Sequence, residues 1–201
     1  MKDTPRSAAN YDRYLSPLDR LVLHKWRRLL WSRARGPHVL EVGVGTGMNI
    51  PHYPPGLHVT ALDKGEHYLK RAQERARRLG RPAHFLAGDV QSLPFEDQIF
   101  DSAVSTFLFC SVEDPRQGLS ELHRVLKPGG LLLLLEHGAS KGFLGRFMNF
   151  FSEPLYRMTG DHIARDTEAL AQDIGFMDVG STHLLLDVVK LVSAQKRPPT
   201  L

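Results

Sequence analysis

Apolar residues along this chain recur with two different periods that alternate from one end to the other. Short segments with apolar and β-branched residues predict strands at 38–42, 57–62, 83–87, 100–106 and 131–136, and the last of these is a nearly unbroken apolar run typical of a strand buried on both faces. Apolar residues three and four positions apart predict amphipathic helices at 16–32, 66–78, 114–126 and 166–174. Two more strands are expected near 176–183 and 185–192. The alternation predicts an α/β fold, a doubly wound and mostly parallel sheet of seven strands with an N-terminal helical arm.

Positive charge is concentrated in the N-terminal part of the chain. Residues 1–36 carry nine lysines and arginines against three aspartates, a net charge of +6, and the rest of the chain carries −2. We expect 1–36 to form an amphipathic arm or lid, 37–195 the main domain, and 196–201 a flexible tail. The cations of the arm predict either a solvated helix face or a peripheral contact with an anionic membrane surface.

Composition narrows the class of protein. With 42% hydrophobic and 24% charged residues among 201, the chain is typical of a globular protein. Cys110 is the sole cysteine, so no internal disulfide can form. The N-terminus shows no apolar signal segment, and the longest aliphatic run, 131–135, is too short to span a bilayer. We expect a cytoplasmic protein, peripheral at the inner membrane surface if the arm binds lipid. The histidines lack the paired spacing of a zinc site, so no metal is expected.

A glycine-rich turn, 41–47, directly follows the first predicted strand. Its glycines are spaced G-x-G-x-G, and because residue 48 is methionine the turn does not match the G-x-G-x-x-G of a pyrophosphate cradle. The turn begins with an acid, Glu41, and two further acids, Asp63 and Asp89, stand at the carboxyl ends of the second and third strands. Open α/β sheets bind ligands at this edge, and a carboxylate at the position of Asp63 can hold ribose hydroxyls. Several carboxylates without a basic cradle favour an uncharged or cationic ligand.

Five motifs in this order resemble the class I S-adenosylmethionine-dependent methyltransferases, at 40–47, 61–63, 88–95, 100–104 and 122–130. The resemblance implies a Rossmann-like fold, S-adenosylmethionine as cofactor and S-adenosylhomocysteine as product. It also implies a set of cofactor-binding residues: Tyr11, Glu41, Gly43, Gly45, Thr46, Gly47, Asp63, Lys64, Gly88, Asp89, Val90, Thr106 and Phe107.

Most of these positions have an implied role in the family. The glycines would pass beneath the methionine part of the cofactor, and Asp63 would hold the ribose. Lys64 would lie along the adenine, with Asp89 and Val90 at its edge. The residues 106–107 would line the side of the methyl donor, and Tyr11 or Tyr14 would close over the cofactor.

The segments 107–112 and 135–138 are most similar to two branches of the family, the animal thiol S-methyltransferases and the bacterial phosphatidylethanolamine N-methyltransferases. Quinone-biosynthesis C-methyltransferases are more distant. Unlike the animal thiol enzymes, this protein is not expected to carry a hydrophobic N-terminal anchor. We expect a small or amphiphilic acceptor, with a thiol favoured over the phospholipid and quinone alternatives. A cofactor-binding module without catalysis is the non-enzyme alternative.

The sequence also offers candidate catalytic and substrate-binding residues. His137 ends the fifth strand at the ligand edge and is the candidate base, which an amine acceptor would need. The aromatic segment 142–160 is predicted to form a substrate cap. A nucleic-acid substrate is disfavoured. Methyltransferases that modify the amino groups of bases usually carry an Asn/Asp-Pro-Pro-aromatic motif after the fourth strand, and this chain has Ser-Thr-Phe-Leu there. The predicted pocket residues are Phe109, Phe147, Phe151 and Tyr156.

Overall fold

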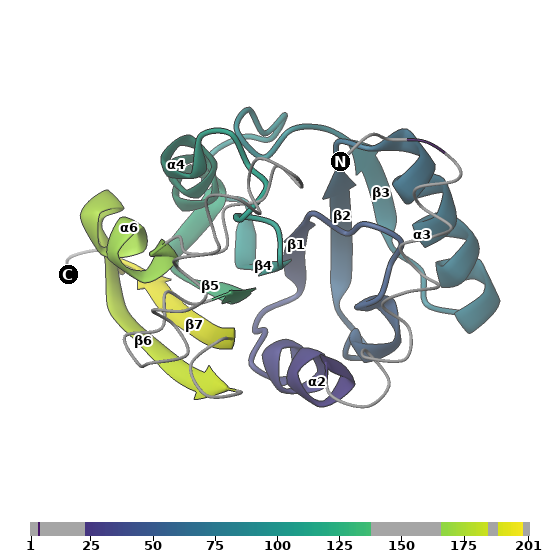
Figure 1. The fold of residues 1–201 in the computed structure, drawn as a ribbon, viewed down its shortest axis with the longest axis horizontal. Helices are drawn as coiled ribbons and strands as arrows, with labels where there is room; N and C mark the ends of the chain where they lie inside the picture. The colour runs from purple at the N-terminus through teal and green to yellow at the C-terminus, as the bar shows by residue number, and fades with distance from the viewer. Residues whose placement is uncertain (1–3, 5–22, 138–165, 185–188, 199–201) are drawn as a thin grey trace, which may run out of the picture.

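The computed structural model describes residue 4 and residues 23–137, 166–184 and 189–198 (Figure 1). The described strands form one seven-stranded sheet in the order β3-β2-β1-β4-β5-β7-β6. Strands β1 to β5 run parallel, and β7 runs antiparallel to both β5 and β6. The predicted seven-stranded, mostly parallel sheet is therefore confirmed. Its strands are β1 (His38–Val42), β2 (His58–Asp63), β3 (His84–Ala87), β4 (Phe100–Thr106), β5 (Leu126–His137), β6 (Phe176–Leu184) and β7 (Val189–Lys196).

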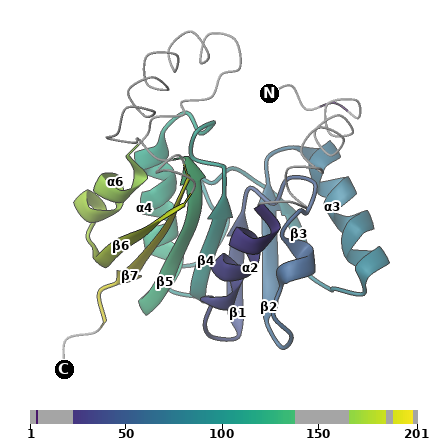
Figure 2. The same cartoon turned by 60° about the horizontal axis from the view of Figure 1, so that its bottom comes forward.

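Helices cover both faces of this sheet (Figure 2). On one face, α2 and α3 pack over alternate strand residues such as Val39, Val104 and Leu133. On the other face, α4 and α6 pack over the intervening residues such as Leu40 and Leu132. Because strand side chains alternate between faces, one apolar run supplies both cores. The helical segments are α2 (His24–Ser32), the 3-10 turn η2 (Ile50–His52), α3 (Glu66–Leu79), α4 (Pro115–Val125) and α6 (Thr167–Ile174).

Local capping sets the helix ends where the sequence predicts them. The Asp114 carboxylate accepts a hydrogen bond from the Gln117 amide at 3.0 Å and caps the start of α4. Asp166 caps α6 in the same way through Ala169. Gly80 closes α3 in a left-handed conformation at φ 60°.

Two strand boundaries differ from the prediction. β5 begins at Leu126 instead of residue 131, because Leu126 already pairs with Phe100 and a bulge absorbs the following Pro-Gly-Gly. The described part of β7 starts at Val189, since 185–188 lie outside the described residues, and β7 runs to Lys196, inside the predicted tail. The Lys196 ammonium also donates to the Leu126 carbonyl at 2.8 Å. Pairing with the neighbouring strands sets these limits, β4 for the start of β5 and β5 for the end of β7, and pairing is not visible in local hydropathy.

The arm 1–36 is described only from residue 23 onward. There α2 buries Leu30 and Trp31 against the sheet, so this part belongs to the core of the domain. None of the described helices is long and apolar enough to cross a membrane. The predicted substrate cap, 142–160, lies outside the described residues.

Candidate functional site

A cavity of about 530 Å³ lies at the carboxyl ends of β1, β2, β3 and β4. Residues that share no local sequence meet there, because parallel strands end at one edge of the sheet. Residues from the loop after β4 form the facing wall, among them Cys110 and Ser111. Nine of the predicted cofactor residues line the cavity: Gly43, Gly45, Asp63, Lys64, Gly88, Asp89, Val90, Thr106 and Phe107.

The glycine turn is held by backbone contacts. Gly43 donates from its amide to the Leu62 carbonyl at 2.8 Å and adopts φ +72°, a conformation that favours glycine. A Cβ added to Gly43 would lie 2.9 Å from a methyl carbon of Leu108. The turn therefore needs glycine at position 43 for both its conformation and its space.

Asp63 connects the turn to the end of β2. One carboxylate oxygen accepts the Gly45 amide at 2.7 Å, and the other accepts the Gly65 amide at 2.9 Å. These two backbone bonds fix the orientation of the carboxylate, whose oxygens can each accept more than one hydrogen bond. The side chain is thus oriented for a ligand with two neighbouring hydroxyls, such as a ribose.

Lys64 and Asp89 form an ion pair on the rim of the cavity, with 2.9 Å between the ammonium and a carboxylate oxygen. Burial raises the pKa of Asp89, but hydrogen bonds from Gln91 and Lys64 outweigh this effect and lower the pKa below its ordinary value. The hydrogen bond to Asp89 in turn raises the pKa of Lys64. Both groups are charged at neutral pH, and the Asp89 carboxylate is ready to accept hydrogen bonds at this end.

A buried polar network lies beneath the turn. Glu41 is fully buried and accepts hydrogen bonds from the Tyr53 hydroxyl and the Asn49 amide. The Asn49 amide oxygen accepts from the Arg27 guanidinium at 2.8 Å. Both Arg27 and Asn49 also donate to the Thr106 hydroxyl oxygen, at 3.0 and 2.9 Å. The network joins α2, η2, β1 and β4 below the cavity.

Burial dominates the acid-base behaviour of Glu41. Removal from water raises its pKa from 4.5 to about 7, although the hydrogen bonds from Tyr53 and Asn49 and the charge of Arg27 act in the opposite direction. Burial and the Glu41 charge raise the pKa of Tyr53 as well, so its hydroxyl keeps the proton that it donates.

Sequence reasoning missed Arg27, Asn49 and Tyr53. The sequence places Arg27 among the cations of the arm, which are expected on a solvated helix face or against an anionic membrane, yet Arg27 is only 4% exposed. A usable signal was its helical spacing, because Arg27 stands three and four residues before the buried Leu30 and Trp31. A cation at a core position of an amphipathic helix indicates a buried partner.

Glu136, near the end of β5, holds the wall of the cavity. Its buried carboxylate accepts the amides of Leu108 and Phe109 at 3.0 and 3.2 Å. These bonds fix the chain directly after Phe107, which adopts the unusual φ of +52°. The Phe107 ring lies 4.7 Å from the ring of His137, measured between centroids. His137 thus supports the wall from behind and is not among the lining residues, and its role as a base stays a prediction.

Several predicted residues lie elsewhere. Glu41 and Thr46 are buried beneath the turn, and Gly47 packs against Ile50 and Ala72, so these three support the turn without lining the cavity. Phe109 differs from the prediction as a pocket residue, because it is fully buried in the core beside α4. The remaining candidates fall outside the described residues: Tyr11, Phe147, Phe151 and Tyr156.

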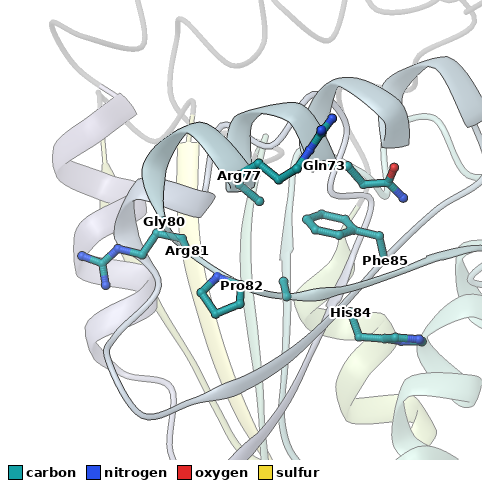
Figure 3. A pocket seen from close by; sticks show the side chains of 9 residues that line it. Gln73, Arg77, Gly80, Arg81, Pro82, His84 and Phe85 are labelled. Atoms are coloured by element: carbon teal, nitrogen blue, oxygen red, sulfur yellow. The ribbon is translucent and has the colours of Figure 1, made fainter.

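A second hollow of about 570 Å³ lies between the end of α3 and the start of β3 (Figure 3). Figure 3 shows Phe85, Arg77 and Pro82 among its side chains. It opens at the amino end of β3, whereas the first cavity lies at the carboxyl ends of the strands. None of the predicted cofactor residues lines it, so the first cavity is the candidate site. Among the described residues, no cluster of three or more potential metal ligands is present.

Comparison with known proteins gives the family. A model of the methyltransferase domain matches residues 40–134. The ubiquinone/menaquinone biosynthesis C-methyltransferase of Bdellovibrio bacteriovorus is 31% identical over 169 residues, which cover 81% of this chain and 72% of that protein. This chain belongs to the S-adenosylmethionine-dependent methyltransferases. The family expected from the motifs is confirmed, and S-adenosylmethionine is the cofactor that the family implies.

Two further methyltransferases extend the comparison. The thiol S-methyltransferase TMT1B of Rattus norvegicus is 36% identical over 135 residues, which cover 64% of this chain. The chain spans 55% of the length of that relative. A SAM-dependent methyltransferase from Thermotoga maritima matches with a TM-score of 0.75 and 21% identity, covering 96% of this chain and 97% of that one. This match shows the shared fold.

Proposed function

We propose that this protein transfers a methyl group from S-adenosylmethionine to a thiol on a small or amphiphilic molecule. The observation that carries the proposal is the convergence of the glycine turn, Asp63, Asp89 and the end of β4 on one cavity. A volume of about 530 Å³ lies within the range of small-molecule sites.

The residues of the cavity fit the cofactor. Gly43 and Gly45 let a ligand approach bare backbone, and the Asp63 oxygens can accept the hydroxyls of a ribose. Asp89 and Val90 would bind the adenine edge, and 106–107 would lie near the sulfur. When bound, the cofactor supplies a methyl group on a cationic sulfonium, which an acceptor lone pair can displace.

A thiol acceptor agrees with the side chains near Thr106. Transfer from a sulfonium needs alignment more than proton chemistry, and a thiol with a pKa of ~8.5 is already a few per cent ionised at pH 7. No imidazole lines the cavity in the part of the chain that the structure describes. The wall includes apolar or soft groups from Phe107, Leu108, Cys110 and Val112, which suit a soft nucleophile. Similarity to the rat thiol S-methyltransferase also supports this acceptor class.

Quinol C-methylation is the second candidate. The Bdellovibrio relative whose name gives this activity is matched over 72% of its length, more than the rat thiol enzyme. Its aromatic acceptor would also suit the Phe107 wall. A screen with labelled cofactor over alkyl thiols, quinols, phosphatidylethanolamine and small amines separates the candidates. A methylated thiol supports the proposal, and labelling of another class alone contradicts it.

Calorimetry with S-adenosylhomocysteine tests the cofactor site directly. We expect Asp63→Ala to weaken binding by about tenfold or more, because hydrogen bonds to a charged acceptor contribute roughly 1.5–3 kcal/mol. Asp173→Ala is the matched control, since Asp173 on α6 forms an exposed ion pair with Arg116 on α4 and does not line the cavity. Equal affinities for the folded Asp63→Ala variant and the wild type would rule out this cofactor site.

A further inference from the structure

The Thr106 hydroxyl has an unusual set of partners. Its oxygen accepts one hydrogen bond from Asn49 and one from Arg27, at 2.9 and 3.0 Å. A hydroxyl has two acceptor lone pairs and one proton, so these two bonds use its acceptor capacity. Within the described ranges, no protein acceptor is found for the proton itself. Thr106 therefore has a donor to offer and no further acceptor.

The neighbouring groups fix this arrangement. Arg27 has only donors, so the Asn49 side chain must turn its oxygen toward Arg27 and its NH₂ group toward Glu41 and Thr106. Neither neighbour can accept the Thr106 proton. Asn49 and Arg27 are both buried, so water does not easily replace them. Thr106 itself lines the cavity at the end of β4.

We propose that Thr106 presents its hydroxyl proton to the methyl acceptor and so selects an anionic sulfur or oxygen over an amine. This inference rests on the proposed methyltransferase function and specifies the acceptor that the same cavity takes. Thr106 is the contacting residue, and Arg27 is a positioning residue that acts through it. Thr106 donates a hydrogen bond and keeps its proton throughout.

The number of lone pairs on the methyl acceptor explains why an anionic sulfur or oxygen is favoured over an amine. A thiolate or phenolate carries several lone pairs, so one can accept from Thr106 while another remains for attack. A phenolate oxygen can likewise accept while its ring carbon attacks. A neutral amine has a single lone pair, and a hydrogen bond from Thr106 would occupy the pair that must attack.

The positive charge of Arg27 acts in the same direction. Its guanidinium carbon lies 5.9 Å from the centroid of the Phe107 ring, which lines the cavity. A cation in a buried setting favours an anionic acceptor nearby. The acidic partner in the network is Glu41, which accepts from Tyr53 and from the same Asn49 amide nitrogen that donates to Thr106, so the Asn49 NH₂ group lies between Glu41 and the Thr106 oxygen. A methyl acceptor bound at Thr106 therefore faces hydrogen-bond donors of the network.

The test compares Thr106→Val with Thr106→Ser, using a thiol and a small amine as alternative acceptors. We expect Thr106→Val to lower kcat/KM for the thiol by about tenfold or more, and Thr106→Ser to retain most of the wild-type value. The amine rate should stay the same or rise in Thr106→Val. The loss in kcat/KM for the thiol should exceed any change in affinity for S-adenosylhomocysteine, and binding of S-adenosylhomocysteine also reports that both variants fold.

Several results would overturn the inference. Equal losses for thiol and amine would show that the hydroxyl does not discriminate, and a parallel loss of S-adenosylhomocysteine affinity would assign it to the cofactor. A wild type that methylates amines alone would also contradict it while leaving methyl transfer intact. Failure of the wild type to bind S-adenosylhomocysteine would instead refute the proposed function. If Thr106→Val does not fold, Thr106→Ser and Thr106→Cys give the same comparison, since a thiol is a weaker donor than a hydroxyl.

Discussion

Glu41→Gln offers a sharp test of the buried network. Glutamine has the shape of protonated glutamate, and it can satisfy the same neighbours. Its carbonyl can accept from Asn49, and its amide can donate to the Tyr53 oxygen. The substitution therefore removes the titration of Glu41 while keeping the packing and the bond from Asn49, and it reverses the direction of the bond with Tyr53.

The magnitude follows from the pKa of Glu41. Raising that pKa from 4.5 to about 7 on folding corresponds to about 3 kcal/mol of coupling between protonation and stability. The folded protein keeps the proton where the unfolded chain has lost it. The stability associated with the protonated form is thus complete below about pH 4.5 and is lost as the pH rises to about 7.

Urea denaturation of the wild type and of Glu41→Gln from pH 5 to pH 8 measures this coupling. We expect the free energy of unfolding of the wild type to fall by about 2–3 kcal/mol relative to the variant across this range. His123, whose pKa is lowered by burial, changes stability in the opposite direction over similar pH values. Its contribution cancels in the difference because Glu41→Gln leaves its surroundings, near Phe176, unchanged.

Parallel profiles would refute the reasoning. They would mean that Glu41 titrates in the folded protein as it does in water, in conflict with its complete burial. A difference that grows in favour of the wild type with rising pH would also refute it. That result would show that Arg27, Asn49 and Tyr53 stabilise the carboxylate by more than burial costs.

Two further substitutions test the turn and the wall. Gly43→Ala should lower stability by about 1–2 kcal/mol through its left-handed backbone and also weaken S-adenosylhomocysteine binding, because its Cβ would meet Leu108. Gly80→Ala, with φ +60° and open space around it, is the control that should lower stability and leave binding unchanged. Glu136→Ala should cost about 2–5 kcal/mol in urea denaturation, since two amides after Phe107 lose their acceptor. An unchanged unfolding midpoint for Glu136→Ala would show that these amides find other partners.

Local sequence determined much of the fold and part of the site. The alternation of apolar segments and amphipathic stretches predicted the sheet and the helices near 66–78, 114–126 and 166–174. Their ends are set locally by caps at Gly80, Asp114 and Asp166, because capping depends on residues three or four apart. The glycine turn and Asp63 were also visible in the sequence, because each stands at the end of a predicted strand. Parallel strands end at one edge, so residues at strand ends must meet whatever the packing.

Only the tertiary structure decided what lies beneath and behind that edge. Arg27 looks like a surface cation until α2 docks on the sheet and turns it toward Asn49. Phe109 looks like a pocket residue until Glu136 holds the loop and directs its ring into the core. The start of β5 and the end of β7 likewise depend on pairing with distant segments, Leu126 with Phe100 and Gln195 with Leu131. These features depend on contacts between distant residues, and hydropathy and spacing along the chain describe only near neighbours.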